Sequence, residues 1–361
     1  MSPSPSWMTG ILLLLALSPY EARGQPSEIP RSGTYTITTR DGSDRTFRVH
    51  LPRGYSATGA AKPLVLMFHG WGGNENEFLD AKIVTSVADQ RGYILVAPRG
   101  LGSNEGEPNS WTFGSYPADK TTPKPGSTAF GSATGLDGDG EHICDDRITP
   151  DYRYQSCTGL YRDSLNITCS WTHCQADDVQ FILELIAYLT NQLNVDKRRI
   201  YAMGGSNGGM FTWELGQNSA SAGLFRAIAP LIGLPHRGYL SAAGNGGILP
   251  VLLITGTRDK VVPPGDWEAP VYTTTANGSD RYYYTGATAI TRIWAQAHGC
   301  NINNPAIAFD DGVRDTDCRS YCPPSGDEWP EVLDCRARMG HSYSLSWSWK
   351  LILDFFDHHS D

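Results

Sequence analysis

Basic residues are in the minority in this 361-residue chain, which has 29 Lys and Arg against 38 Asp and Glu and a formal net charge of −9. Binding to nucleic acid or to an anionic membrane needs a positive surface, so this balance argues against both partners. The chain also lacks internal repeats. Beyond its N-terminal region it has no long apolar run, so we expect neither a membrane span nor a lipid-anchor tail.

The apolar run near the N-terminus covers Ile11–Leu17. It is too short to cross a bilayer, and Ala22-Arg23-Gly24 follows it as a small-x-small cleavage site. We therefore predict that residues 1–24 are a signal peptide and that the chain is secreted. The remaining residues 25–361 fit one large α/β domain better than two independent domains.

Cysteine usage supports an oxidising, extracellular destination. The eight cysteines form two groups of four in the sequence: Cys144, Cys157, Cys169 and Cys174, and then Cys300, Cys318, Cys322 and Cys335. We expect four disulfides with pairing inside each group, while the connectivity stays open. Two sequons, at Asn166 and Asn277, are expected glycosylation sites if a eukaryotic cell secretes the chain.

The order of apolar segments predicts an α/β fold. Residues 34–39 and 46–51 alternate in polarity around Asp41-Gly42, which is typical of an antiparallel hairpin. Continuous apolar runs at 64–68 and 93–97 are typical of buried parallel strands, and a helical period covers 77–91 between them. Further strands are expected before residue 206 and over 227–232 and 249–255, with helices over 175–189, around 290–294 and over 347–356. This alternation predicts a mostly parallel, doubly wound sheet that begins with an antiparallel hairpin.

Residues 100–174 interrupt that alternation with a stretch rich in Gly, Pro, Ser, Asp and aromatic residues. A long stretch without periodic structure is usually functional or cross-linked, so we expect a disulfide-held insertion over the active face. Within it, Asp137, Asp139 and Glu141 offer oxygen atoms of the kind that Ca²⁺ binds, but not at the spacing of an EF-hand. We favour a solvated acidic loop there, and we expect no cofactor.

Ser206 is the most informative residue in the chain. It lies in Gly204-Gly205-Ser206-Asn207-Gly208, after an apolar strand and before a helix-compatible segment. A serine with glycine two residues before and two residues after it is typical of a nucleophile elbow, a turn so sharp that larger residues do not fit. With 39 glycines in the chain the pattern alone is weak, and its strand–turn–helix context makes it specific.

A nucleophilic serine needs a base, and the base needs an acid that fixes its tautomer. Asp259 follows the strand expected at 249–255, and His341 lies in the loop before the last helix, in the order Ser, Asp, His. Asp266 is the competing acid but lies farther from the strand end. We predict Ser206 as nucleophile, Asp259 as acid and His341 as base.

The developing oxyanion needs preorganised N–H donors. We assign one to the backbone of Asn207, directly after the nucleophile, and the other to the backbone of Trp71, in the glycine-rich loop that follows the strand at 64–68. His69 opens that loop, and we expect it to hold hydrogen bonds rather than to catalyse.

With these residues in place, the chain resembles the secreted feruloyl esterase and polyhydroxybutyrate depolymerase group of α/β-hydrolases. The matching segments are His69–Gly73, Asp177–Phe181, Val195–Met210, Gly256–Asp259, Trp294–Cys300 and Gly340-His341. The resemblance implies an α/β-hydrolase fold and the same three catalytic residues. It also implies that Cys300 pairs with a cysteine in the segment leading to His341. Two features depart from the group: the long acidic insertion, and Ser-Tyr-Ser after His341 in place of a tryptophan-proline pattern.

We interpret the chain as a monomeric serine esterase, with Trp71, Trp111 and Trp267 as substrate-binding residues because aromatic faces suit phenolic acids, sugars and polyesters. Hydroxycinnamoyl esters on plant polysaccharide are the first choice of substrate, followed by short polyhydroxyalkanoate esters and acetyl-xylan. A hydrolase-fold binding protein without catalysis and a protease are the rival interpretations.

Overall fold

The computed structural model describes a large part of the chain. The described residues are 28–102, 106–112, 144–145, 147–149, 154, 156, 172–173, 175–237, 248–268, 271–278, 280–304, 306–310, 312–322 and 328–360. The predicted signal peptide and most of the predicted insertion lie outside these residues.

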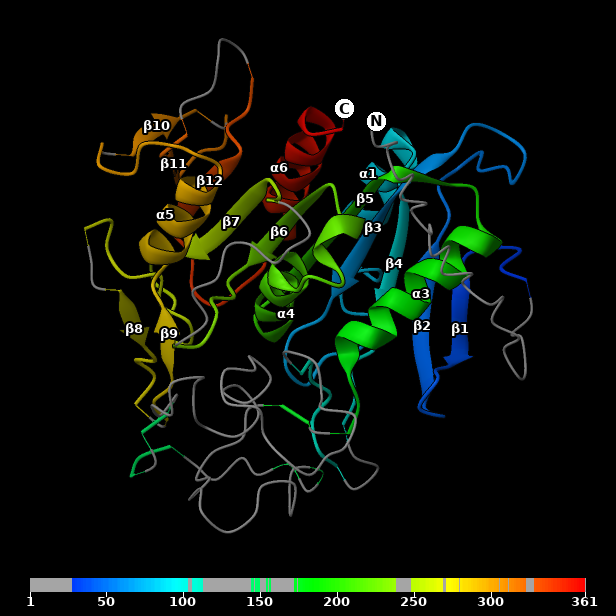
Figure 1. Ribbon diagram of the computed structural model, residues 1–361, viewed down its shortest axis with the longest axis horizontal. Helices are drawn as coiled ribbons and strands as arrows, with labels where there is room; N and C mark the ends of the chain where they lie inside the picture. Colours follow the sequence, from blue (N-terminus) through cyan, green and yellow to red (C-terminus); the bar gives the residue numbers. More distant parts are fainter. Residues whose placement is uncertain are drawn as a thin grey trace, which may run out of the picture.

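Within the described residues, ten strands form one sheet in the order β1-β2-β4-β3-β5-β6-β7-β12-β11-β10 (Figure 1). Their bounds are β1 Gly33–Thr38, β2 Asp44–His50, β3 Lys62–Phe68, β4 Ile94–Pro98, β5 Val195–Gly205, β6 Ala227–Leu231, β7 Val251–Gly256, β10 Ile307–Phe309, β11 Thr316–Ser320 and β12 Val332–Ala337. A separate two-stranded ribbon pairs β8 Tyr272–Thr274 with β9 Tyr283–Thr285.

The six central strands, from β4 to β12, pair in parallel, and the strands at both ends of the sheet pair antiparallel. The predicted antiparallel hairpin is confirmed as β1–β2. Phe68 lies beside Gly204, and Gly256 beside Ala337, so β3, β5, β7 and β12 end at one edge of the sheet. The loops that follow these strands therefore meet at that edge.

Helices cover both faces of the sheet (Figure 1). They are α1 Lys82–Arg91, α3 Asp178–Gln192, α4 Asn207–Gln217, α5 Ala287–Ala297 and α6 Leu345–His358, with a 3₁₀ turn at Ala222–Leu224. The alternate side chains of β3 divide between two cores: Leu64 packs with residues of α3, α4 and α5, and Val65 packs with residues of α1 and α6. The predicted doubly wound arrangement is confirmed.

The helix predicted at 77–91 begins only at Lys82, so that prediction was wrong in its first turn. Ala81, the residue before the helix, has an extended backbone (φ −74°, ψ 108°), and this conformation interrupts the helical path between Glu77 and Lys82. Ile83, placed in the predicted apolar stripe, is 41% exposed. The helix predicted at 175–189 is present as α3 but begins three residues later, at Asp178, because Asp177 is its N-cap and accepts the N–H of Gln180 at 3.0 Å.

Two disulfides join cysteines of the second group, Cys300 to Cys322 and Cys318 to Cys335. Cys318 and Cys335 lie opposite each other on β11 and β12. Of the first group, Cys144 is buried and disulfide-bonded, while Cys157, Cys169 and Cys174 lie outside the described residues. Every cysteine that the structure describes is in a disulfide. In the same part of the chain, no helix is long and apolar enough to span a bilayer.

Candidate active site

Ser206 lies at the turn between β5 and α4 with φ 54° and ψ −118°, a backbone conformation that a residue with a side chain adopts at a cost. Two backbone hydrogen bonds support it. The Ser206 N–H donates to the carbonyl of Leu231 at 2.9 Å, and the Ser206 carbonyl accepts the N–H of Met210 at 2.9 Å. The neighbouring strand and the following helix thus hold the strained residue in place.

The glycines on either side make the sharp turn possible. A Cβ atom on Gly204 would collide with the carbonyl of Gly208, and one on Gly208 would collide with the carbonyl of Phe68 at the end of β3. Because the colliding atoms are backbone, they have little freedom to move away. The spacing of glycines around Ser206 therefore reflects close backbone contact, and the same contact brings the elbow against the loop that begins at His69.

His341 stands between Ser206 and Asp259. Its Nε2 lies 2.8 Å from the Ser206 Oγ, and its Nδ1 lies 2.7 Å from Oδ2 of Asp259. The buried Asp259 carboxylate is fixed in turn, because its Oδ1 accepts the N–H groups of Val261 at 2.8 Å and Val262 at 2.9 Å. A carboxylate only accepts, so Nδ1 carries the imidazole hydrogen and Nε2 presents a lone pair to the Ser206 hydroxyl.

The topology explains why these residues meet. Asp259 follows β7 and His341 follows β12, and these two strands are parallel neighbours. Asp266, the competing acid, is exposed to solvent instead. The structure thus brings together the same serine, aspartate and histidine that the sequence singled out.

The loop after β3 is organised by His69, whose side chain is buried. Its Nε2 accepts the N–H of Gly100 at 2.9 Å, so its Nδ1 carries the hydrogen and donates to the carbonyl of Gly70 at 2.7 Å. Burial lowers the pKa of His69, which keeps the ring neutral in this role. The Gly70 carbonyl also accepts the N–H of Gly73 at 3.0 Å. In a trans peptide the N–H of Trp71 points opposite to that carbonyl, so its direction is fixed as well.

Asn207 is the first residue of α4, where backbone N–H groups have no partner within the helix. Its buried side chain pairs with the backbone of Trp111: the amide oxygen accepts the Trp111 N–H at 2.8 Å, and Nδ2 donates to the Trp111 carbonyl at 3.4 Å. The indole N–H of Trp111 donates to the carbonyl of His69 at 3.0 Å. Trp111 thereby links the two segments predicted to supply oxyanion donors.

Comparison with solved structures places this arrangement among known folds. An acetyl xylan esterase from Aspergillus awamori superimposes with a TM-score of 0.53 at 12% identity, over 90% of this chain and 99% of that chain. This chain has the α/β-hydrolase fold.

Two further similar structures have TM-scores too low to carry an argument. A poly(3-hydroxybutyrate) depolymerase from Bordetella parapertussis gives 0.38 at 15% identity, over 74% of this chain and 77% of that chain. A ferulic acid esterase from Anaeromyces mucronatus gives 0.36 at 18% identity, over 68% of this chain and 78% of that chain. No protein-family model matches the chain, and no curated protein matches its sequence.

The three tryptophans predicted to bind substrate have different surroundings in this α/β-hydrolase fold. Trp71 is 41% exposed, and its indole N–H donates to the hydroxyl of Tyr154 at 2.7 Å. The prediction for Trp111 was wrong, because its side chain is fully buried and stacks on Phe211 with ring centroids 5.1 Å apart. Trp267 is partly exposed.

Two guanidinium groups pack on the ring of Trp267, those of Arg336 at 3.6 Å and Arg319 at 4.2 Å from its centroid. Its indole N–H donates to Asp317 at 3.1 Å. These contacts place the ring against β11 and β12, and cation–π stacking of this kind is sufficient to explain its position. Trp71 is therefore the one predicted tryptophan whose surroundings favour contact with a ligand.

Asp178 has a larger role than its place in the first turn of α3 indicated. Its fully buried carboxylate accepts hydrogen bonds from Arg45 at 2.5 Å, from the N–H of Thr112 at 2.8 Å and from Nε2 of His173 at 2.9 Å. Burial alone would raise the pKa of Asp178, but the charge of Arg45 and the bond from His173 outweigh it and lower the pKa to about 2. Asp178 thus fixes the segment that carries Trp111. Its position next to the cap residue Asp177 gave no sign of this.

No cluster of three or more His, Cys, Asp or Glu side chains arranged to hold a metal occurs among the residues that the structure describes. The residues considered for Ca²⁺, Asp137, Asp139 and Glu141, lie outside that part of the chain, as does the sequon residue Asn166. Asn277, the other sequon residue, is exposed.

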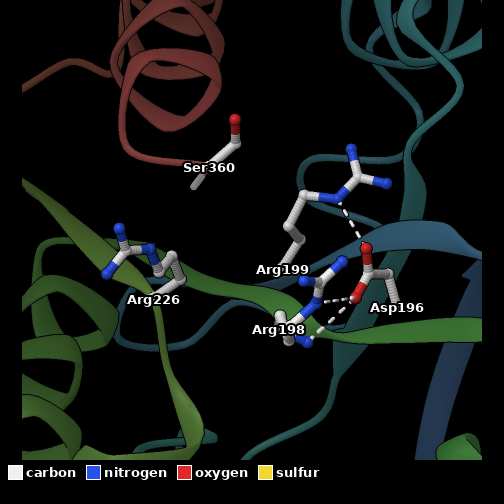
Figure 2. Close-up of a pocket in the computed structure, with 5 residues that line it drawn as sticks. All are labelled: Asp196, Arg198, Arg199, Arg226 and Ser360. Carbon is white, nitrogen blue, oxygen red and sulfur yellow. Dashed lines mark hydrogen bonds and ion pairs between the residues drawn. The ribbon is translucent and has the colours of Figure 1, made fainter.

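A separate hollow of about 430 Å³ lies at the opposite edge of the sheet (Figure 2). It is lined by Asp196, Arg198 and Arg199 from β5, by Arg226 just before β6, and by Ser360 near the C-terminus. Asp196 pairs with Arg199 at 2.8 Å. Because Ser206 follows the other end of β5, this hollow is not part of the candidate active site.

Proposed function

We propose that this protein is a secreted serine hydrolase of carboxylic esters that works through an acyl-enzyme intermediate. The proposal rests above all on one observation, the hydrogen-bonded series Ser206, His341 and Asp259, with Nε2 of His341 2.8 Å from the Ser206 Oγ. A histidine in the correct tautomer beside a serine hydroxyl is the arrangement that nucleophilic acyl transfer needs.

In the acylation step, the Ser206 Oγ attacks the ester carbonyl carbon while Nε2 of His341 takes the hydroxyl proton. The Asp259 carboxylate stabilises the imidazolium that forms. When the tetrahedral intermediate collapses, the bond from carbon to the alcohol oxygen breaks, and Nε2 returns the proton to the leaving alcohol. Water then repeats the sequence. Its oxygen attacks the acyl carbon while Nε2 takes one of its protons. When the bond from the acyl carbon to the Ser206 Oγ breaks, Nε2 returns that proton to the Oγ and the free acid leaves.

The negative charge on the carbonyl oxygen would be stabilised by the backbone N–H groups of Asn207 and Trp71. Asn207 begins α4, so its N–H lies at the positive end of the helix dipole. The Trp71 N–H direction is set by the hydrogen bonds to the Gly70 carbonyl. Donors fixed before the reaction stabilise the transition state without reorganising during it.

As substrate we propose hydroxycinnamoyl esters on plant polysaccharide. The exposed indole of Trp71 supports an aromatic acyl group, because it lies beside the proposed oxyanion donor and offers a face for stacking. Polyhydroxyalkanoate esters and acetylated xylan are the alternatives, and the acetyl xylan esterase that shares the fold makes acetyl esters a necessary arm of the test. We further propose that the enzyme is a monomer without a metal cofactor.

The test is hydrolysis by purified, oxidised mature protein, compared with Ser206→Ala and with a control, Ser86→Ala, on the exposed face of α1. The substrates are methyl ferulate, p-nitrophenyl acetate and butyrate, acetylated xylan and polyhydroxybutyrate. We expect ferulate hydrolysis in the wild type and the control, with kcat lowered by about 10⁶-fold in Ser206→Ala. Activity confined to acetyl or polyester substrates would replace the proposed acyl group, and no activity on any ester would overturn the proposed function.

A further inference from the structure

A half-buried carboxylate beside the proposed oxyanion loop takes no part in the acid–base series. Oε1 of Glu77 accepts the backbone N–H of Gly70 at 3.0 Å, and the same oxygen accepts a hydrogen bond from the phenol of Tyr343. Tyr343 follows His341 by two residues. One carboxylate oxygen therefore links the loop after β3 to the loop that carries the proposed base.

The ring of Tyr343 also touches the nucleophile elbow. A Cβ atom on Gly205, the residue before Ser206, would collide with that ring, so the two are in direct contact. On another side the ring packs against Phe78, with centroids 5.0 Å apart. Burial raises the pKa of the Tyr343 phenol, and the negative charge of Glu77 raises it further. The phenol thus remains protonated and keeps donating to Glu77.

These contacts fix the peptide that joins Gly70 to Trp71. The Gly70 N–H is bound by Glu77, and the Gly70 carbonyl is bound by His69 and by the N–H of Gly73. Because the Gly70 N–H already donates to Glu77, it is not available to donate to an oxyanion. The Trp71 N–H shares the peptide plane of the Gly70 carbonyl, so whatever holds Gly70 also aims Trp71.

We propose that Glu77 and Tyr343 are positioning residues that aim the Trp71 N–H at the oxyanion and fix this donor relative to Ser206 and His341. The proposal rests on the ester hydrolysis proposed above, and it adds a role for two residues outside the three catalytic ones. The hydrogen bonds of these two side chains go to Gly70 and to each other, not to Ser206, Asp259 or His341. Both act through the backbone of Gly70 and through the ring contact with Gly205.

The test compares Tyr343→Phe, which keeps the ring but removes its hydroxyl, with Glu77→Gln, which keeps the shape but removes the charge. Removing an oxyanion donor outright costs about 10²–10³-fold in kcat, so a misaimed donor should cost about 10-fold, with KM nearly unchanged. The matched control is Tyr93→Phe, which also removes a hydroxyl that donates to a carboxylate, that of Asp357 at 2.6 Å. Tyr93 lies just before β4, at the edge of the sheet opposite Ser206. The control should keep the wild-type kcat.

A second readout separates aiming from general loosening of the fold. An aryl boronic acid forms a tetrahedral, anionic adduct with a serine Oγ, so its affinity should fall by the same factor as kcat in both variants, at an unchanged melting temperature. In the double variant the losses should not multiply, because both residues act through one hydrogen-bonded unit. If Tyr343→Phe does not fold, Glu77→Gln gives the same comparison.

Wild-type kcat and boronate affinity in folded variants would overturn the positioning role while leaving the proposed function intact. A change confined to KM would also overturn it. A wild-type protein that neither hydrolyses esters nor binds the boronate would instead overturn the proposed function itself, and the positioning role with it.

Discussion

The two sides of Ser206 are built in different ways. On the proposed acid–base side, His341 has two polar partners, Ser206 and Asp259, and its side chain is 25% exposed. On the proposed oxyanion side, Trp111 and Asn207 are fully buried and are hydrogen-bonded to each other, and Trp111 also donates to the His69 carbonyl. The first side depends on the chemistry of three side chains. The second depends on backbone directions that remote side chains hold, so its parts should fail through packing and stability as well as through chemistry.

The largest effect is expected on the acid–base side, from Asp259→Asn. Oδ1 of Asp259 accepts two backbone N–H groups, so the amide oxygen should keep that place and the amide NH₂ should face Nδ1 of His341. The imidazole must then carry its hydrogen on Nε2 and is unable to take the Ser206 proton. We expect kcat to fall by about 10⁴-fold, with the fold unchanged. Steady-state kinetics on methyl ferulate and a melting curve measure both. A loss below tenfold would show that Asp259 does not set the tautomer.

The sequence predicted the acid–base side because its members are identified by residue type and by order along the chain. Ser206, Asp259 and His341 each follow a strand, and parallel strands bring their following loops to one edge. The glycine spacing also predicted the backbone contacts of the elbow. The same reasoning predicted the doubly wound sheet and its hairpin, and the structure confirms both.

The oxyanion side was less accessible to sequence reasoning, since what matters there is which carbonyl or N–H a distant side chain binds. Trp111 was wrongly predicted to bind substrate, because an aromatic residue in a polar stretch gives no sign of which way it faces. Glu77 was placed in a helix that begins five residues later. The Ser-Tyr-Ser departure after His341 was the one signal that pointed to Tyr343.

The next effect sharpens the contrast through stability. Asp178→Asn leaves the buried Arg45 without its counter-charge, and breaking a buried pair in this way costs about 3–5 kcal/mol of unfolding free energy. The matched control is Asp80→Asn, which removes an Arg48–Asp80 pair of the same 2.5 Å length that is exposed to solvent. The control should cost less than about 1 kcal/mol. Chemical denaturation of both variants tests this, and equal losses would contradict it.

Because the pKa of Asp178 is lowered, the stability that the Arg45–Asp178 pair contributes depends on pH. This pKa is lowered from 3.8 to about 2 in the folded protein, so the folded state binds its proton less readily than the unfolded state. The stabilisation is therefore present above about pH 4 and is lost as the pH falls toward 2. Wild type should lose stability relative to Asp178→Asn across that window, while Asp80→Asn should follow the wild type.

The smallest effect decides which tryptophan meets the substrate. Trp71→Phe shortens an exposed ring and removes its bond to Tyr154, while the backbone N–H remains. We expect KM for methyl ferulate to rise by about 3–10-fold, since stacking contributes on the order of 1 kcal/mol, with kcat and stability little changed.

Trp111→Phe should instead change stability and not KM. It removes buried volume and the bond to the His69 carbonyl, so it should lower the unfolding free energy by about 2 kcal/mol and leave KM alone. If both variants raised KM equally, the buried tryptophan would have to reach the substrate, and the division between a chemical side and a packed side of Ser206 would fail.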